Sequence, residues 1–598
     1  MKTIARFIAI ALFTSTAVQI ASGCAAYPDR QQASIKEVPI SPDTGKTADL
    51  VLLARVWGYL KYFSPVISER NIDWDKVLVD QLKAMDENPN AGVLPSIRAM
   101  LDSAALSAPS GRKSGAKQLA DAKEIEKVNV NHEWIASAKQ LGQAEKDRLT
   151  ALADYFKPFK NKYIITPDVS GYPSPQFKEE TYGKDFLPEK HYRLLALFRY
   201  WNIIEYYLPA KYQQQGQWPA KLARFIPDFA DANTDRAYAQ ALIRLNAAIT
   251  DGHSIMPTFA KFPEYVLPGR LIRLPFTMAV IGDTVFVHQT DSGFAEMSGM
   301  RPGDRVHSIN GMPVIRYVDS LRAVMSDPRR EMKDYYISVS AMLRMMPASG
   351  DTLKVGYESG GQPKTFRVKY GEDDVARYLA IGARAWAKQQ EAQKQEVPPP
   401  GMRMLEGDIL YIDPAKWSGK MADTTRELLA KAKSLIIECR TYPNFDFINF
   451  THFLFKKQTE CILWNGTISY PGLTKTVEYK RGPDRKVHFK GKVVVLIAEK
   501  SVSRPEMLTM IVKARKGNTV LIGRTTGGAD GDVTQIPMVG NQDMRFVISG
   551  LGVLYPDGGY TQGIGIVPDV EVPLTVAEFT GGKDVIYQRA LQYLAANP

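Results

Sequence analysis

The first 260 residues contain an internal repeat, and a repeat restricts a chain to folds in which both copies adopt the same structure. Five identical residues recur at the same spacing 144 positions apart: Arg55, Trp57, Tyr62, Pro65 and Trp74 in the first copy, and Arg199, Trp201, Tyr206, Pro209 and Trp218 in the second. The bulky residues follow each other at helical steps before a proline, as on one face of a helix that ends there. We therefore predict a duplicated helical module, with one helical domain over 45–165 and a second over 186–265, in which the aromatic residues serve packing rather than chemistry.

The length and composition set the number and kind of domains. At 598 residues, the chain is too long for a single hydrophobic core, and we expect three or four domains. Hydrophobic residues make up 45% of the chain and charged residues 23%, which is typical of a globular protein.

The N-terminus has the pattern of an export signal. Lys2 and Arg6 precede an apolar stretch, Phe7–Ile20, which is short for a membrane span. Small residues then lead to Cys24 in a segment that resembles a bacterial lipoprotein cleavage box, although Ala21 stands where leucine is usual. We expect residues 1–24 to direct export to the bacterial cell envelope, to the periplasm or to the outer membrane with lipid attached at Cys24. A simple secretory cut near Cys24-Ala25-Ala26 is the alternative.

The net charge of +12 and the three cysteines exclude few functions. The positive charge is spread along amphipathic segments, which favours attraction to an anionic envelope surface, and no nucleic-acid-binding motif accompanies it.

Cys439 and Cys461 could pair in an oxidising compartment, or Cys439 could simply belong to a buried apolar run. The histidines are scattered and the cysteines lack the spacing of metal ligands, so we expect no metal and no cofactor.

A segment in the middle of the chain resembles PDZ domains. Residues 294–306 include a Gly303-Asp304 turn, and Asn310-Gly311 follows shortly after. In PDZ domains, a similar segment runs from a short helix through a Gly-Asp turn into a strand and a hairpin. The resemblance implies a PDZ-like, β-rich domain over 266–371, which would bind extended peptides by strand addition or would serve as a spacer or lid. A proline-containing linker over 372–402 is expected to follow.

The last region, 403–598, has the pattern of a buried parallel sheet. Short apolar runs alternate with helix-like segments, and these runs are Ile409–Ile412, Ser434–Cys439, Val493–Ala498 and Thr519–Ile522. Ser503 follows the third run and opens a helix-like segment, so its hydroxyl is expected at a helix N-terminus, where the dipole favours an oxyanion. The same Ser-x-x-Glu pattern, Ser503 to Glu506, also fits a helix-capping box.

A second short motif, Asp251-Gly252-His253-Ser254, supplies an imidazole, the side chain best suited to accept a serine proton near neutral pH. The order of motifs resembles that of the tail-specific, or C-terminal-processing, serine peptidases, a family that includes the tricorn core protease. The resemblance covers about 245–575 and runs through Ser503, Glu506, Gly523–Gly528 and Gly565–Asp569. It implies a multidomain α+β protein with an α/β, ClpP/crotonase-like core, in which Ser503 is the nucleophile.

The resemblance also indicates which residue is the general base that accepts the serine proton. One subtype of the family uses a lysine a few residues after the Gly-Arg-Thr turn, but that position is Ala529 here. The tricorn-like subtype uses a histidine in a motif like Asp-Gly-His-Ser before the PDZ-like region, and His253 matches it. The resemblance therefore implies that His253 is the base.

Two further parts of the implied site depart from the family pattern. Oxyanion donors would be the N–H groups of Arg504 and of Tyr442 or Asn444, because Pro443 between them has no N–H. The tricorn-like pattern also has a serine directly before the histidine and a glutamate near Gly-x-x-Pro-Asp. Gly252 and Gln562 occupy these positions, so Ser254 is expected to supply the hydroxyl and Gln562 an uncharged hydrogen bond.

These patterns lead to one expectation and two alternatives. We expect an exported serine endopeptidase that cleaves protein or peptide tails. The first alternative is a weak or inactive peptide-binding protein of the same fold, and the second is a ligand-binding module similar to the retinoid-binding repeats. Arg524 and Asp569 are expected to have structural roles.

Overall fold

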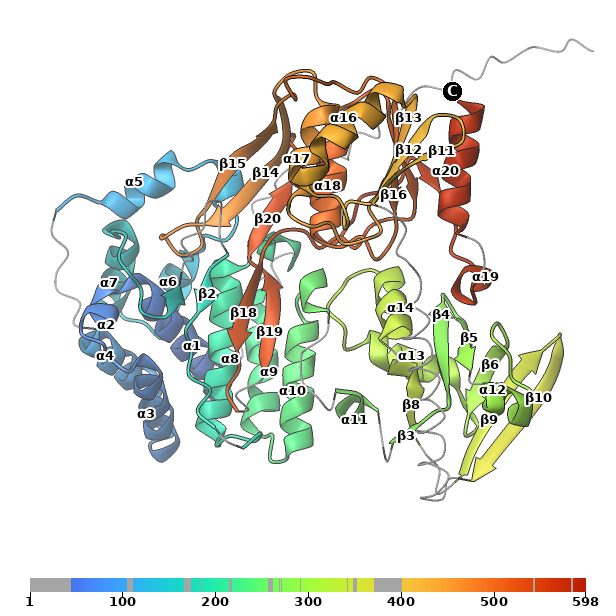
Figure 1. Ribbon diagram of the computed structural model, residues 1–598. Helices are drawn as coiled ribbons and strands as arrows, with labels where there is room; N and C mark the ends of the chain where they lie inside the picture. The colour runs from blue at the N-terminus through green and yellow to red at the C-terminus, as the bar shows by residue number, and fades with distance from the viewer. Residues whose placement is uncertain are drawn as a thin grey trace, which may run out of the picture.

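The computed structural model describes residues 45–104, 111–165, 174–183, 185–214, 218–255, 262–267, 269, 271–290, 292–340, 342–347, 352–369, 401–540, 544–581 and 584–597. Figure 1 shows a helical region at the lower left, a β-rich domain at the lower right and a mixed α/β core above both. The expected signal, residues 1–24 with Cys24, and nearly all of the expected linker lie outside the described residues. Within the described part of the chain, no helix combines the length and apolar character needed to cross a membrane.

The helical region consists of two related units and the segments that join them. The first unit is α1 (Lys46–Phe63), α2 (Pro65–Glu69), α3 (Trp74–Glu87) and α4 (Leu94–Ser103), and the second is α8 (Lys190–Tyr207), α9 (Trp218–Ala230) and α10 (Asp235–Ala247). Between them lie α5 (Ser114–Asp121), η1 (Glu124–Glu126), α6 (Glu133–Ser137), α7 (Gln143–Asp154), β1 (Ile164–Ile165) and β2 (Gln176–Phe177). Short elements η2 (Lys211–Gln214), η3 (Gly252–Ser254) and α11 (Phe262–Val266) complete the region.

Hydrogen bonds between tryptophans confirm the repeat. The indole N–H of Trp57 donates to the carbonyl of Trp74, and Trp74 donates back to the carbonyl of Trp57, both at 2.9 Å. Trp201 and Trp218 form the same reciprocal pair at 3.1 and 3.2 Å. All four side chains are buried, so they pack the two units as the sequence predicts.

Helices α1 and α8 face each other through equivalent residues. A Cβ atom at Gly58 would lie 2.0 Å from Cγ of Asn202, its equivalent in the second unit, so only glycine fits there. The amide of Asn202 donates to the carbonyl of Ala54 at 3.0 Å. One turn further on, the rings of Tyr62 and Tyr206, also equivalents, meet at 5.7 Å. Because equivalent residues meet at successive turns, the two helices run side by side in the same direction.

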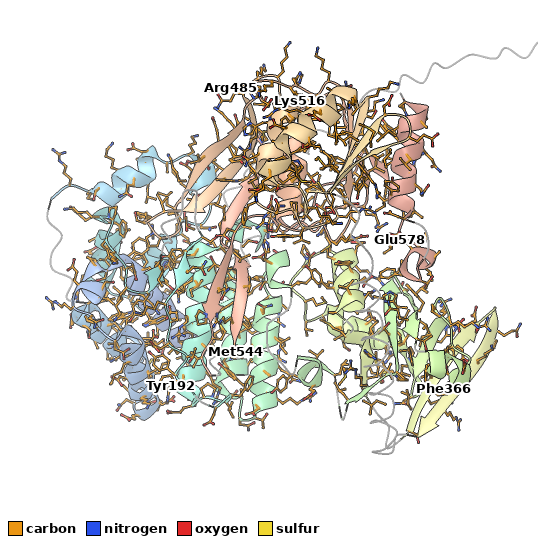
Figure 2. All side chains as sticks on the ribbon, in the orientation of Figure 1. Tyr192, Phe366, Arg485, Lys516, Met544 and Glu578 are labelled. Atoms are coloured by element: carbon orange, nitrogen blue, oxygen red, sulfur yellow. The ribbon has the colours of Figure 1, made fainter. Side chains whose placement is uncertain are left out.

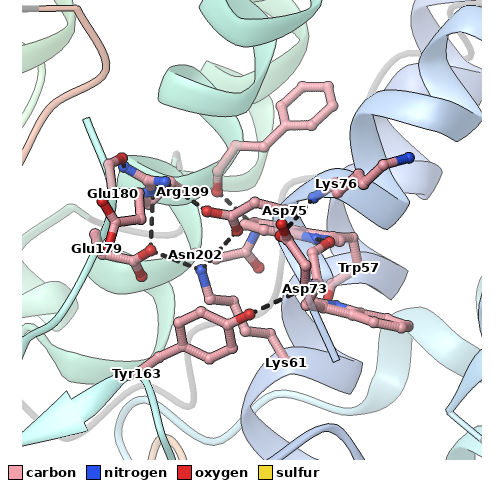
Figure 3. Close-up of polar contacts among 12 residues, drawn as sticks. Trp57, Lys61, Asp73, Asp75, Lys76, Tyr163, Glu179, Glu180, Arg199 and Asn202 are labelled. Atoms are coloured by element: carbon pink, nitrogen blue, oxygen red, sulfur yellow. Dashed lines mark hydrogen bonds and ion pairs between the residues drawn. The ribbon is translucent and has the colours of Figure 1, made fainter. Parts of the chain in front are cut away.

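A buried ionic cluster ties the units together (Figure 3). Nζ of Lys61 lies 3.1 Å from Asp75 and 2.9 Å from Glu179, and Arg199 lies 2.6 Å from Asp75 and 3.1 Å from Glu179. All four side chains are at most 2% exposed, and the two positive and two negative charges balance. Such a cluster fixes the arrangement of α1, α3 and α8, because loss of one partner leaves a charge buried without compensation.

The two units share one core, whereas the sequence predicted a separate domain for each copy. The same core also includes apolar side chains of β18 (Val533–Pro537) and β19 (Arg545–Ser549). In Figure 1 this hairpin reaches from the α/β core down along α8, α9 and α10. It therefore joins the last third of the chain to the helical region and carries Ser549 to η3.

The β-rich domain contains every element expected from its PDZ-like segment. Its elements are β3 (Leu271–Arg273), β4 (Phe276–Ile281), β5 (Thr284–Thr290), α12 (Ser292–Ser298), β6 (Arg305–Ile309), β7 (Met312–Pro313), α13 (Val314–Arg322), α14 (Arg330–Val339), η4 (Met342–Arg344), β8 (Met345–Pro347), β9 (Thr352–Ser359) and β10 (Gln362–Lys369). The sheet order is β10-β9-β6-β5-β4, with β7 paired to β6. Helix α12 leads through the Gly-Asp turn into β6, and Asn310 and Gly311, both with positive φ, turn the chain into β7.

The α/β core confirms the predicted parallel sheet. Its elements are β11 (Met402–Leu405), β12 (Ile409–Ile412), η5 (Gly419–Met421), α16 (Ala422–Lys431), β13 (Ser434–Glu438), α17 (Phe447–Phe450), η6 (Thr451–Leu454), β14 (Thr459–Thr467), β15 (Thr474–Arg481), β16 (Lys492–Ile497), α18 (Arg504–Lys513), β17 (Thr519–Gly523), β20 (Leu551–Leu554), β21 (Val570–Glu571), α19 (Val576–Phe579) and α20 (Val585–Ala596). The order is β11-β12-β13-β16-β17-β21, parallel from β12 onward. Cys439 and Cys461 are both buried and free, so they do not pair.

Candidate functional site

Ser503 lies where strand β16 gives way to helix α18. Its backbone has φ 68° and ψ −119°, a conformation that residues other than glycine rarely adopt. Such a residue costs on the order of 1–3 kcal/mol, and strained backbone of this kind is concentrated at functional sites. The serine is the N-cap of α18, so the free N–H groups and the positive end of the helix dipole are beside it.

The buried carboxylate of Glu506 holds the segment around Ser503 in place. It accepts hydrogen bonds from the N–H of Ser503 at 3.2 Å, of Gly528 at 2.7 Å and of Ala529 at 2.9 Å, and from the hydroxyl of Thr526 at 2.5 Å. Burial raises the pKa of Glu506, and these donors oppose that shift. The Glu506 half of the expected capping box is therefore present, and the same carboxylate also anchors the turn at 526–529.

His253, in η3, contacts a serine that sequence reasoning missed. Its Nδ1 lies 2.7 Å from the hydroxyl oxygen of Ser549, and that hydroxyl donates to Oδ1 of Asp251 at 2.8 Å. A serine has one hydroxyl hydrogen, and here the carboxylate accepts it. Ser549 must then accept from Nδ1–H, which leaves the lone pair of His253 on Nε2. This tautomer is the one that a general base requires.

Asp251 is fully buried and accepts four hydrogen bonds. Besides the Ser549 hydroxyl, its donors are the N–H of His253 at 3.0 Å, the N–H of Ser549 at 2.6 Å and the amide of Gln562 at 2.8 Å. The same Gln562 nitrogen lies 3.0 Å from the Ser549 hydroxyl. Gln562 therefore holds the acid and the hydroxyl together, rather than contacting the imidazole itself.

The environment of His253 favours its neutral form. Burial lowers the pKa of His253, and the negative charges of Asp251 and Asp532 raise it in part. A neutral imidazole near pH 7 is ready to accept a proton.

Ser254 does not have the position expected of it. Its hydroxyl is buried and donates to Oδ1 of Asn246 at 2.6 Å, and the Asn246 amide donates back to the Ser254 carbonyl at 2.6 Å. The hydroxyl beside the imidazole comes instead from Ser549. Asp251 lies within the motif that the sequence singled out, but nothing in the sequence connects it with Ser549, 298 positions away.

The turn 526–529 lies between the loops that carry Ser503 and His253. A Cβ atom at Gly252 would lie 2.8 Å from Cβ of Ala529, and the N–H of Gly527 donates to the carbonyl of Ser501 at 2.9 Å. Among the described residues, no hydrogen bond joins His253 directly to Ser503. Catalytic hydrogen bonds are often long without substrate and shorten only when it is bound.

The expected oxyanion donors differ in what they already bind. Arg504 is the first residue of α18, so its N–H has no acceptor within the helix, and its guanidinium donates to the carbonyl of Pro443 at 2.6 Å. The N–H of Asn444 donates to the carbonyl of Pro414 at 3.4 Å. Of the two residues expected from this turn, Tyr442 is therefore the better donor, and Arg504 holds the turn beside the nucleophile.

The remaining polar candidates have structural partners. Arg524 pairs with Glu499 at 2.7 Å and with Glu578 at 2.9 Å, while Asp569 accepts from the N–H of Leu521 at 2.8 Å. In the residues that the structure describes, no three His, Cys, Asp or Glu side chains are grouped to hold a metal ion.

Comparisons with known proteins find one family match and several similar solved structures. Residues 452–572 match the model of peptidase family S41. Among solved structures, mature CPAF in complex with lactacystin has 12% sequence identity and a TM-score of 0.46, with 68% of this chain and 97% of that chain covered. The photosystem II D1 C-terminal processing protease has 14% identity and a TM-score of 0.32, with 66% and 98% covered. The tricorn protease has 15% identity and a TM-score of 0.30, with 68% and 36% covered.

No curated protein matches the chain in sequence. The segment that matches the family model contains Ser503, Glu506, Ser549 and Gln562. It lies within the longer part of the chain, about 245–575, in which the motif order resembles the tail-specific peptidases. Residues 452–572 therefore form a domain of peptidase family S41, and the protein is a serine-type peptidase.

Proposed function

We propose that this protein is an exported endopeptidase that cleaves protein or peptide tails, with Ser503 as nucleophile and His253 as general base. The observation that carries the proposal is the set of contacts from His253 through Ser549 to Asp251. These contacts fix the imidazole tautomer and leave Nε2 as the proton acceptor.

The proposed reaction has two stages. The hydroxyl oxygen of Ser503 attacks the peptide carbonyl while its proton passes to Nε2 of His253; the C–N bond then breaks, and the same proton passes to the leaving amine. A water molecule, deprotonated by His253, hydrolyses the resulting ester and regenerates Ser503. The N–H groups of Arg504 and Tyr442 stabilise the oxyanion in both stages.

Asp251 supplies the charge that Gln562 lacks. When His253 accepts a proton, the imidazolium donates through Nδ1 to Ser549, whose hydroxyl in turn donates to the Asp251 carboxylate. The carboxylate does not need to accept the proton, because its charge and the fixed orientation stabilise the imidazolium. In this arrangement Gln562 orients Asp251 and Ser549 through its two contacts.

The proposed preference of the enzyme for protein or peptide tails rests on its family match and its domain architecture. One structurally similar protein is named as a C-terminal processing protease. Among the described strands, β10 lies at one edge of the β-rich sheet, and extended peptides can bind to a sheet edge as an added strand. Export, with membrane attachment through Cys24, is part of the same proposal and rests on the N-terminal sequence.

One observation favours the alternative of a peptide-binding protein with little activity. His253 and Ser503 are not hydrogen-bonded to each other, so the pair must draw together before attack. Against this alternative stand the strained backbone of Ser503 and the contacts that lead from Nδ1 of His253 through Ser549 to Asp251.

The test is labelling with a fluorophosphonate, which forms a covalent bond with an activated serine. We expect labelling at Ser503, loss of the label in Ser503→Ala and a strongly reduced rate in His253→Ala. Digestion of an unfolded protein substrate should likewise be lost in Ser503→Ala and strongly slowed in His253→Ala. If the unaltered protein is neither labelled nor active on that substrate, the binding-protein alternative replaces the proposal.

A further inference from the structure

A cavity of about 410 Å³ lies on the α/β core and is lined by basic side chains. The basic residues are Lys456, Lys457, His488, Lys490, Arg515 and Lys516, which we call the cationic cavity. No Asp or Glu is among the described residues that line it. Figure 2 labels Lys516 at the top of the core, on the side away from the helical region and the β-rich domain.

The cationic cavity is separate from the site at Ser503. Lys490 precedes strand β16 and Arg515 follows helix α18, whereas Ser503 comes after β16 and before α18. The cavity and the serine therefore lie at opposite ends of the same strand and helix. With six residues in β16, at about 3.3 Å per residue, the two ends of the strand are about 17 Å apart.

The positive charges of the cavity have no acidic partners in the described structure. Lys456, Lys457, Lys490 and Lys516 form no ion pair within the described residues, and the nearby Asp484 is held by Arg426 at 2.9 Å. Burial lowers the pKa of His488, and the positive charges of Arg515, Lys490 and Lys456 lower it further. Part of this charge complements the C-terminal end of the α18 dipole, but one helix end carries only about half a charge.

Arg515 forms a fixed point within the cavity. Its guanidinium donates to the carbonyls of Phe489 at 2.9 Å, Gly491 at 2.8 Å and Asn518 at 3.2 Å. These bonds hold the charge in place, while the lysine side chains around it are exposed and can adjust to a ligand. A fixed guanidinium surrounded by ammonium groups suits a compact anion with several oxygens.

We propose that the cationic cavity binds a phosphate-bearing anion. Its volume is in the range of small-ligand sites, and its charge selects an anion with more than one negative charge. The phosphate could belong to a free compound or to the headgroup of an envelope lipid. This inference concerns a second site and does not depend on the proposed peptidase mechanism.

The test measures pyrophosphate binding by calorimetry on the chain from Gly45 onward, which contains every described element. The triple variant Lys456→Gln/Lys490→Gln/Lys516→Gln removes three cavity charges. The matched control Lys139→Gln/Lys157→Gln/Lys160→Gln removes three exposed lysine charges from the helical region. We expect the cavity variant to bind on the order of tenfold more weakly, and the control and Ser503→Ala to bind like the unaltered chain.

Co-sedimentation with vesicles distinguishes the two sources of phosphate. Binding to vesicles that contain phosphatidylglycerol, with loss in the cavity variant and no binding to pure phosphatidylcholine, identifies a lipid headgroup. Pyrophosphate binding without vesicle binding identifies a free phosphate compound. The proposal is overturned if neither probe binds, if the control variant loses as much affinity as the cavity variant, or if polyglutamate binds the cavity more tightly than pyrophosphate.

Discussion

The hydroxyl of Ser549 lies between His253 and Asp251, 2.7 Å from Nδ1 of the imidazole and 2.8 Å from Oδ1 of the carboxylate. The family pattern places a hydroxyl directly before the histidine and an acid at the position of Gln562. Here the hydroxyl comes from strand β19 and the acid lies two residues before His253. The hydroxyl and the acid of the family pattern thus have counterparts here, but these lie at other positions of the chain.

A second close contact accounts for the small residues at positions 252 and 529. A Cβ atom at Gly252 would lie 2.8 Å from Cβ of Ala529 and 3.1 Å from Oδ2 of Asp327. A serine at 252 and a lysine at 529 would therefore compete for one space. The departures at 252 and 529 fit each other, and Gln562 contacts both Asp251 and Ser549, so the three departures do not by themselves indicate a lost activity.

We predict that Ser549→Ala and Asp251→Asn each lower kcat/KM by roughly 10²- to 10⁴-fold, because the imidazole loses its orientation and its stabilised charge. The measurement is hydrolysis of a peptide substrate by folded protein, with circular dichroism to verify folding. Ser254→Ala is the matched control, since its hydroxyl binds Asn246 outside this network. A comparable loss in Ser254→Ala, with none in Ser549→Ala, would instead support the assignment made from sequence.

The pH dependence of kcat/KM should reveal the charge of Asp251. His253 acts as a base only when neutral, and burial lowers its pKa, so the acidic limb should lie below the usual value of about 6.5. The Asp251 charge raises that pKa in part. In Asp251→Asn the residual activity should therefore have its acidic limb at still lower pH. A limb that stays in place, or moves to higher pH, would contradict the assignment of Asp251.

Restoring the family's serine before the histidine should impair this protein. Gly252→Ser introduces a Cβ atom into the space of Ala529, so we expect a displaced His253 and a fall in kcat/KM of at least about tenfold. Gly252→Ser/Ala529→Gly should recover part of the loss, because it removes the atom in closest contact. Equal activities of the single and double variants would show that the two positions are not coupled.

Glu506→Gln tests the anchor of the nucleophile. The carboxylate accepts from four donors, whereas an amide presents an NH₂ group to some of them. We expect a loss of about 1–3 kcal/mol in the free energy of unfolding and slower labelling of Ser503 by a fluorophosphonate. Urea unfolding and the labelling rate are the two measurements. Unchanged labelling by the folded variant would limit Glu506 to a capping role.

The parts of this site that could be predicted from sequence are those that lie in short local motifs, and not those brought together from distant segments. Ser503 and His253 each lie in a short motif, and β16 and the start of α18 follow from a local apolar pattern and a cap. Ser549 has no such signal, because it reaches His253 only after the β18–β19 hairpin packs on the helical region. For the same reason the sequence suggested two helical domains, while the shared core forms through contacts between distant segments.

The pairing of equivalent residues in α1 and α8 allows a sharp test of the duplication. Gly58→Asn places a second side chain where Asn202 already lies, so we expect a loss of about 1–3 kcal/mol in the free energy of unfolding. The exchange Gly58→Asn/Asn202→Gly should recover much of it. An asparagine at 58 can donate to the carbonyl of Ala54 or Phe198, the pair of equivalent carbonyls that Asn202 binds at 3.0 and 2.8 Å. The measurement is the free energy of unfolding of both variants in urea. An exchange variant less stable than Gly58→Asn alone would show that the two units are related in sequence but do not share this contact.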